Sequence, residues 1–457
     1  MSYRGRVIAL FALVAAVAAS SLTTGCTSSL ASSAAPSGSA AAAPTVVLTP
    51  TKPAKAPQPM GTLPDGSKIV LLSWNDLGMH CFNSDFSQIA VLPPYNNLYA
   101  QVIRVGSDPS PITSGVTVEY RYPDNTYSVG GAGKPSKSNF WTYAKALFNV
   151  DLKPDIGLTG RGLSGAMDAK SGYFVADGIP VTDKRDIDAG TNNIYPFQVA
   201  EVTVKDSTGK AVAWTSVVTP VATEMRCDTC HSKTGAASVK SKIQATDDPY
   251  RNILLTHDKL AGTAFAKMGF KALADSTPVL CASCHSSNAL GTKGKPGVLS
   301  LSNAMHKRHS NVGIPATTEG CQSCHPGPNT KCLRDVHSQT LNFQCQNCHG
   351  DIAKVATNPN PWLDEPRCDD PACHKNTPAS MLTQSNALYK LSTGHHGGIF
   401  CEACHDSTHA LAKSREPNDG LKFAALQNGD TSFLHTCSVC HGVASPEGQT
   451  KAHAPGN

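Results

Sequence analysis

Large apolar and aromatic residues are missing from long parts of this 457-residue chain. Residues 27–61 are mostly Ala, Ser, Thr and Pro, so they cannot bury a core and are expected to form a flexible linker. After residue 26 no run is apolar enough to cross a bilayer, which excludes a protein built from membrane-spanning helices. Phe, Trp and Tyr are scarce after residue 225, so the C-terminal half needs another kind of group to fill its interior.

Cysteine, in contrast, is abundant, and 14 of the 17 cysteines belong to one repeated pattern. Six copies read Cys-x-x-Cys-His, and a seventh has four residues between its cysteines. The paired cysteines are Cys227/Cys230, Cys281/Cys284, Cys321/Cys324, Cys345/Cys348, Cys368/Cys373, Cys401/Cys404 and Cys437/Cys440. The histidines that follow them are His231, His285, His325, His349, His374, His405 and His441.

This pattern is typical of c-type haem attachment. The two thiols form thioether bonds to the porphyrin vinyl groups, and the next imidazole can ligate the iron. Zinc knuckles and disulfides also use closely spaced cysteines, but neither requires a histidine directly after the second one. The sequence therefore predicts seven haem groups with these histidines as proximal ligands. The prediction is weakest at Cys368/Cys373, where the alternative is a pair of structural thiols.

Residues 1–26 have the features of an export signal. Arg4 and Arg6 precede an apolar run too short to span a membrane, and the segment ends in Leu22-Thr-Thr-Gly-Cys26. This ending resembles a lipoprotein processing box, so Cys26 is a candidate lipidation site that would tether the protein to a membrane. Ordinary signal cleavage nearby is the alternative.

The formal net charge of +5 does not indicate a nucleic-acid partner. Removing the signal deletes Arg4 and Arg6, and seven haems would add fourteen propionates, for a net charge of about −11. The mature protein is therefore expected to be acidic.

Two folded regions are expected after the linker. Residues 62–222 carry the strand signal, with Val-, Ile-, Tyr- and Trp-rich segments at 68–74, 98–105, 116–122, 197–205 and 211–218. The last two flank a short turn and predict a hairpin, and residues 139–150 predict a helix. We expect a mainly β, sandwich-like domain here. Residues 223–457 are expected to be short helices and loops packed around haem, with little regular structure.

Histidine is plentiful enough to ligate each iron from both faces, since ten histidines remain outside the motifs. His306 and His309 would share one helix face and could serve two different haems. The candidate distal ligands are His257, His306, His309, His337, His395, His396, His409 and His435. His80 and His453 are weaker candidates, and the pairing of histidine with haem cannot be read from the sequence.

Three further features allow simpler interpretations. A Cys–His nucleophile at His80-Cys81 is disfavoured, because sequence neighbours rarely have the required geometry. Cys81 and Cys332 are either a disulfide or two buried thiols. The loop with Asp183, Asp186 and Asp188 does not have EF-hand spacing and is expected to be a solvated acidic loop rather than a calcium site.

Several stretches resemble multihaem c-type cytochromes exported by metal-respiring bacteria. They are residues 321–328, 331–334, 345–350, 361–368 and 397–405, with 74–81 and 93–99 similar to N-terminal regions of that group. The resemblance implies bis-histidine haems, electron transport across the cell envelope, and an outer-membrane lipoprotein facing the periplasm or the cell surface. The long insert at Cys368–His374 departs from the family.

The expected function is therefore electron transfer along closely packed haems to another cytochrome or an extracellular acceptor, without enzymatic catalysis. One alternative is a reductase of a small nitrogen or sulfur oxyanion with one open haem. The uniform proximal histidines argue against it. Another is a subunit, paired with copies of itself, of a cytochrome filament.

Overall fold

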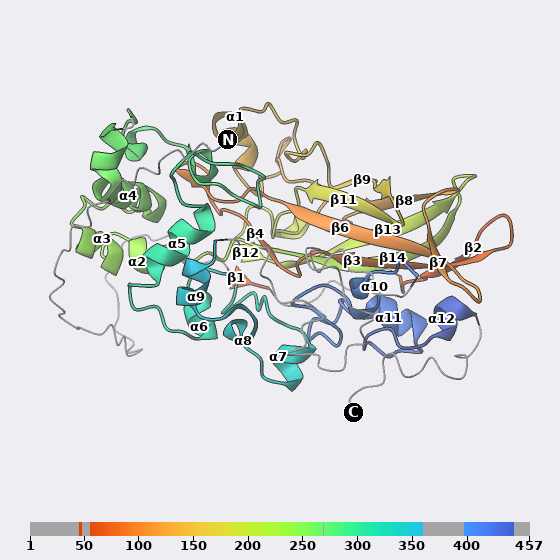
Figure 1. The fold of residues 1–457 in the computed structure, drawn as a ribbon. Coiled ribbons are helices and arrows are strands. Elements are labelled where there is room, and N and C mark those ends of the chain that lie inside the picture. The colour runs from red at the N-terminus through yellow and green to blue at the C-terminus, as the bar shows by residue number, and fades with distance from the viewer. Residues whose placement is uncertain (1–44, 48–54, 268, 360–396, 443–457) are drawn as a thin grey trace, which may run out of the picture. The chain divides into compact units, whose positions relative to one another are not determined.

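The β-forming segments between residues 62 and 222 are assembled into two sheets in the computed structural model, which describes residues 45–47, 55–267, 269–359 and 397–442 (Figure 1). The signal, Cys26, the Cys368/Cys373/His374 motif, His395, His396 and His453 lie outside the described residues. The strands are β1 (Thr45–Val46), β2 (Met60–Thr62), β3 (Lys68–Asn75), β4 (His80–Cys81), β5 (Ile89–Ala90), β6 (Asn96–Arg104), β7 (Ser110–Ile112), β8 (Val116–Arg121), β9 (Ser164–Ala166), β10 (Asp168–Lys170), β11 (Tyr173–Ile179), β12 (Asn193–Ile194), β13 (Phe197–Asp206), β14 (Ala211–Ala222) and β15 (Val279–Leu280).

One sheet has the order β10-β11-β6-β3-β2, with β7 also paired to β6, and the other has the order β4-β14-β13-β8-β9. The pairings within these two sheets are antiparallel except for β4 with β14, which is parallel. Two further two-stranded sheets, β1 with β12 and β5 with β15, are parallel. The predicted hairpin is confirmed as β13–β14, and Asp206 stabilises its turn by accepting from the Thr208 and Lys210 amides at 2.9 and 3.1 Å. The other predicted strands are confirmed as β3, β6 and β8.

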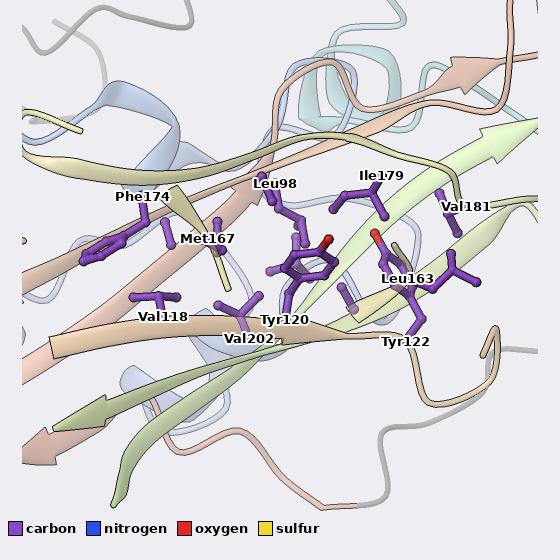
Figure 2. Packing of buried hydrophobic residues seen from close by; sticks show 14 of the residues in the cluster. Leu98, Val118, Tyr120, Tyr122, Leu163, Met167, Phe174, Ile179, Val181 and Val202 are labelled. Atoms are coloured by element: carbon purple, nitrogen blue, oxygen red, sulfur yellow. The ribbon is translucent and has the colours of Figure 1, made fainter. Parts of the chain in front are cut away.

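Apolar side chains from both sheets meet in one cluster, which includes Leu98, Val118, Tyr120 and Val202 (Figure 2). Alternate residues of β3 contribute to two different clusters. Ile69 and Leu71 belong to this first cluster, whereas Val70, Leu72 and Trp74 pack with Ile399, Phe400 and Ala403. Both faces of β3 are therefore buried, which explains its unbroken apolar run. The sandwich-like arrangement of the sheets stays a prediction.

The helices are short and lie mostly after residue 225. They are α1 (Phe140–Phe148), α2 (Asp228–His231), α3 (Ala236–Ser241), α4 (Pro249–Lys267), α5 (Leu301–His309), α6 (Thr318–Cys321), α7 (Val336–Thr340), α8 (Cys345–His349), α9 (Ile352–Thr357), α10 (Cys401–His405), α11 (Leu421–Leu426) and α12 (Ser438–His441). The structure confirms the helix predicted at 139–150 as α1. In Figure 1, α10, α11 and α12 lie beside the sheets, where α10 and α12 contact β3 and α11 contacts β14.

The C-terminal region buries few apolar side chains of its own. Among the described residues from 225 to 359, the buried apolar ones are Tyr250, Leu254, Ala274, Ala282 and Ala356. Leu299, Met305, Val312 and Leu341, in contrast, are among the large apolar residues left exposed. This region consists of short helices and loops, as predicted, and its polypeptide alone supplies little core. None of the helices in the described ranges is long and apolar enough to span a membrane.

Candidate cofactor site: paired histidines beside the cysteine motifs

Each described Cys-x-x-Cys-His motif forms a helical turn. The histidine N–H donates to the carbonyl of the first cysteine at 2.9–3.1 Å in the motifs that begin at Cys227, Cys281, Cys321 and Cys437. The motifs at Cys345 and Cys401 are the helices α8 and α10. Residues i, i+3 and i+4 of a helical turn lie on one face. The two thiols and the imidazole of one motif therefore share a face, as attachment and ligation of one group require.

The second cysteines of the described motifs differ in exposure. Cys230, Cys324 and Cys348 are exposed, whereas Cys284, Cys404 and Cys440 are half-buried. Cys404 and Cys440 pack against the apolar cluster that includes Val70 and Trp74, and the Ser283 hydroxyl lies 3.9 Å from the Cys284 sulfur. The thioether bonds of all seven motifs stay predictions.

Four motif histidines lie opposite a second histidine. The pairs and the distances between their ring centroids are His231–His309 at 6.5 Å, His285–His257 at 6.4 Å, His325–His306 at 6.0 Å and His349–His409 at 6.2 Å. Two imidazoles that bind one metal from opposite sides have centroids about 6 Å apart, because each metal–nitrogen bond is about 2 Å and each nitrogen lies about 1 Å from its ring centre. The four pairs therefore have the spacing that two axial ligands of one iron require.

Hydrogen bonds to the backbone fix the orientation of several of these rings. Nδ1 lies 2.8 Å from the Ser302 carbonyl oxygen in His306, 2.7 Å from that of Met305 in His309 and 2.8 Å from that of Leu299 in His285. A carbonyl can only accept, so Nδ1 carries the proton in each ring. Nε2 is then the nitrogen with a free lone pair and the one available to a metal.

Burial keeps five of the eight paired imidazoles neutral. It lowers the pKa of His231, His325 and His349 to about 4, with a smaller effect from the neighbouring histidines. The pKa values of His257 and His409 are lowered for the same reason. Neutral imidazole is the form that binds metals, so these rings are competent ligands at pH 7.

The helix α5 carries two of the second histidines. His306 and His309 are three residues apart on it and face the motifs at Cys321 and Cys227, respectively. The Ser300 side chain caps the helix by accepting from the Asn303 amide at 3.1 Å. Asn303 also donates to the Asn358 carbonyl at 2.6 Å, so α5 is fixed against the end of α9.

A buried carboxylate connects the chain before the first motif to the loop after the third. Glu224 accepts from the amides of Gly327, Asn329 and Thr330 at 3.1, 3.1 and 2.9 Å and from the Thr330 hydroxyl at 2.7 Å. These hydrogen bonds lower the pKa of Glu224 against the opposing effect of burial. The Cys227 and Cys321 motifs are held together by this contact.

Cysteines of different motifs also approach one another. The Cys321 and Cys345 thiols interact with each other, which raises the pKa of Cys321 and lowers that of Cys345. Burial, and then the charge of Cys324, raises the pKa of Cys227. Burial and then the charge of Cys440 do the same for Cys404. Neighbouring motifs in space are therefore first with third, third with fourth, and sixth with seventh.

Two of the described distal candidates have acidic neighbours and are not among the four pairs. His337 bonds Asp335 through Nδ1 at 3.0 Å and stacks on Phe343. His435 directs Nε2 to Asp430 at 2.9 Å and is about half exposed. Their assignment as distal ligands stays a prediction.

The weaker candidate His80 also has an acidic neighbour, because its Nε2 lies 2.8 Å from Asp76. The two remaining described motif histidines have different surroundings from the four paired ones. His405 stacks on Phe433 with ring centroids 5.2 Å apart, and His441 is the last residue of α12. The distal ligands of these two motifs stay predictions.

The loop at residues 75–81 does not contain an activated nucleophile. Cys81 forms no disulfide, and burial raises its pKa to about 11, so the thiol stays protonated. Cys332 is also a free thiol, and its pKa is raised to about 12 by burial, with a minor contribution from Cys81. Of the two alternatives for Cys81 and Cys332, the structure has separate thiols, and both are half-buried.

The expectation of a solvated acidic loop at residues 183–188 is wrong. Asp183 is buried and accepts from the Thr223 amide and hydroxyl at 3.0 and 2.5 Å, and Asp188 is buried against Arg185. Asp186 pairs with Lys137 at 2.6 Å. Composition alone did not reveal these partners, because they are distant in sequence or lie in a turn. Within the described part of the chain, no group of three or more His, Cys, Asp or Glu residues could hold a metal ion.

Sequence reasoning also missed residues that hold the second histidines. Leu77 contributes only a backbone carbonyl, and Ser300 only a helix cap, so neither has a side chain that marks a ligand site. A sequence signal existed for Ser300, since serine precedes the helix containing His306 and His309. The chain matches no known family model, no curated protein and no solved structure.

Proposed function

We propose that the chain is an exported seven-haem c-type cytochrome that carries electrons along a row of closely packed haems. The single observation that supports it best is the 6.0–6.5 Å spacing of four histidine pairs, each with one histidine from a cysteine motif. A bound haem iron would supply reversible one-electron chemistry. The sequence motifs and the shortage of apolar core in the C-terminal region support the same proposal.

The protein's own residues would bind, orient and enclose each group. The motif cysteines would anchor it, the motif histidine would bind one face of the iron, and the paired histidine the other. The backbone carbonyls at Nδ1 would hold the rings in the ligating tautomer. Exposed Leu299, Met305 and Val312 would be covered by porphyrin. With both faces occupied, no coordination site is left for a substrate at these four irons, which favours the carrier over the reductase.

The proximity of motifs supports transfer between groups. The helices α6 and α8, which belong to the Cys321 and Cys345 motifs, contact each other, so groups attached to these motifs would be neighbours. Electrons would leave to another cytochrome or an extracellular acceptor. The proposal includes a lipid anchor at Cys26, an outer-membrane location and a sandwich-like N-terminal domain that serves docking or attachment.

Mass spectrometry and electron paramagnetic resonance test the proposal on protein purified from a strain that matures c-type cytochromes. We expect a mass with seven covalent haems and an oxidised spectrum that contains only low-spin iron, because two imidazoles give a strong ligand field. The His257→Ala variant should convert one haem to high spin. The matched control, His80→Ala, should not, since Nε2 of His80 is bound to Asp76.

A colourless protein would refute the haem assignment. A high-spin haem in the unsubstituted protein would instead favour the reductase, because it would show an iron with an open face.

A further inference from the structure

The segment that carries His409 has an unusual backbone. His409 and Asp406 have φ values of +65° and +71°, in the left-handed region that residues other than glycine rarely adopt. Such conformations are strained for residues other than glycine and persist only where the surroundings determine them. The surroundings of this segment must therefore hold it in place.

Those surroundings belong to the β-rich region, more than 300 residues earlier in the chain. The His409 ring donates from Nδ1 to the Leu77 carbonyl at 3.0 Å, and the Asn75 amide donates to the Ser407 hydroxyl at 3.1 Å. Arg334 adds a third contact, because its amide donates to the His409 carbonyl at 2.9 Å. Both the ring and the backbone of His409 are thus fixed by residues from outside its own segment.

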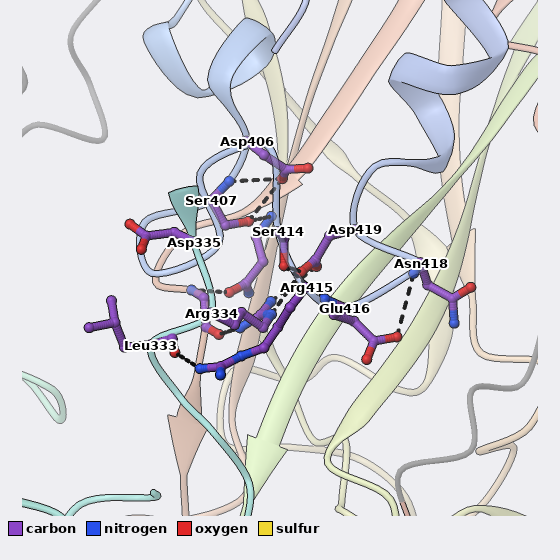
Figure 3. Close-up of polar contacts among 12 residues, drawn as sticks. Leu333, Arg334, Asp335, Asp406, Ser407, Ser414, Arg415, Glu416, Asn418 and Asp419 are labelled. Atoms are coloured by element: carbon purple, nitrogen blue, oxygen red, sulfur yellow. Dashed lines mark hydrogen bonds and ion pairs between the residues drawn. The ribbon is translucent and has the colours of Figure 1, made fainter. Parts of the chain in front are cut away.

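The loop that provides these contacts is itself tightly held. The Asn75 side chain accepts from the Leu77 and Gly78 amides at 3.2 and 2.7 Å and donates to the Asn97 carbonyl on β6 at 2.8 Å. The Arg334 guanidinium donates to the Gly78 carbonyl and is buried in a bidentate pair with Asp419 at 2.7 and 3.0 Å. Figure 3 shows Arg334, Asp419 and Ser407 in this polar network.

Gly78 allows the loop to approach His409. A Cβ at Gly78 would lie 1.7 Å from the Thr408 carbonyl oxygen and 3.2 Å from the His409 Cβ. Its φ of +79° adds a second reason for glycine. Any side chain at this position would displace the His409 segment from the loop.

We infer that the loop at residues 75–78 positions His409 as the distal ligand opposite His349, so that the β-rich region completes one haem site of the C-terminal region. This inference rests on the proposed function. The Leu77 carbonyl fixes the tautomer that leaves Nε2 free, and Gly78 sets the distance. Leu77 and Gly78 are therefore positioning residues for an axial ligand, and the β-rich region controls the ligation of one haem.

Carbon monoxide binding to the reduced holoprotein tests the inference, because the gas binds only where an axial ligand leaves the iron. His409→Ala should open one haem per molecule. Gly78→Ala should raise the carbon monoxide affinity of that same haem about ten- to hundredfold, the usual effect of losing a partner of a metal-bound histidine. Its electron paramagnetic resonance signal should change as well. Gly66→Ala is the matched control, since Gly66 has φ +81° but no atom within 4 Å of a Cβ.

If the Gly78→Ala protein does not accumulate, Ser407→Ala provides a second test of the inference. This substitution removes the hydroxyl that accepts from the Asn75 amide, and it adds no atom. It should raise the affinity of the same haem in the same direction. Unchanged carbon monoxide binding in the variants that fold, with an effect in His409→Ala, would overturn the inference alone. No effect in His409→Ala would instead refute the ligand pair, and a wild-type protein without haem would refute the proposed function.

Discussion

At the scale of single residues, the junction between the two regions depends on one buried guanidinium. Arg334 is about 1% exposed and pairs with Asp419, which is about 4% exposed. The bidentate geometry compensates both charges in this buried position. Glu416 lies in the same network but does not share this pair. Its burial, followed by the charge of Asp419, raises the pKa of Glu416 to about 7 (Figure 3).

Glu416 should make stability depend on pH. Its pKa rises from 4.5 in the unfolded chain to about 7 in the folded one, so the folded state binds more protons between these values. Stability should therefore fall as pH rises from about 4.5 to about 7, by about 3 kcal/mol if Glu416 acts alone. Glu416→Gln should lack this fall, because its amide does not titrate.

Denaturant unfolding of the wild type and of Glu416→Gln at pH 5 and pH 7.5 measures this difference. The expected result is that the variant gains stability over the wild type at the higher pH. Parallel pH dependence in the two proteins would mean that Glu416 is not the group responsible.

At the scale of elements, the short helix α5 carries two histidines that face two different motifs. Two residues three apart on a helix are separated by a rotation about 60° short of a full turn. Their side chains therefore share a face but point in different directions. His306 faces His325 at 6.0 Å, and His309 faces His231 at 6.5 Å. One element thus places a histidine opposite each of two motifs and, in the proposed function, would fix the distance between two haems.

Removing the two ligands of α5 should open two different haems. His306→Ala and His309→Ala should each create one carbon monoxide site in the reduced protein, and the double variant should create two. The reason is that each histidine lies opposite a different motif histidine. Gas titration followed by visible spectroscopy counts the sites. A double variant with only one site would show that both histidines serve the same iron.

The sequence predicted α5 as the shared source of two ligands, because a separation of three residues is a property of the helix alone. The sequence also predicted five of the strands, because Val- and Ile-rich segments bounded by turns reflect local preference. These strands are β3, β6, β8, β13 and β14. The sequence did not predict which motif histidine His409 faces. His409 lies four residues after His405, yet it faces His349, because the left-handed backbone at Asp406 and His409 turns the ring away from His405. Tertiary contacts from Leu77 and Arg334 determine that turn, and no local pattern encodes them.

At the scale of the whole molecule, the order of motifs in space differs from their order in the chain. The Cys227 and Cys321 motifs are neighbours, although the Cys281 motif lies between them in sequence. Two features stabilise this arrangement. Helix α5 places one histidine opposite each of the two motifs, and Glu224 binds the loop after the Cys321 motif. The β-rich region positions two other motifs, because β3 packs against α10 and α12, which belong to the Cys401 and Cys437 motifs. The path of electrons in the proposed row would therefore be set by packing rather than by sequence order.

The net charge of the whole molecule should report the number of haems. Without its signal the chain carries about +3, and each ferrous haem adds two propionate charges, so the reduced protein should carry about −11. Cys368→Ser with Cys373→Ser should remove one haem from the mass and shift the charge to about −9. Cys81→Ser removes a half-buried free thiol outside the motifs and should change neither quantity. Native electrophoresis of the reduced protein measures the charge, and intact mass measures the number of haems. An unchanged haem mass in the double variant would show that Cys368/Cys373 is not an attachment site. The row would then have six members.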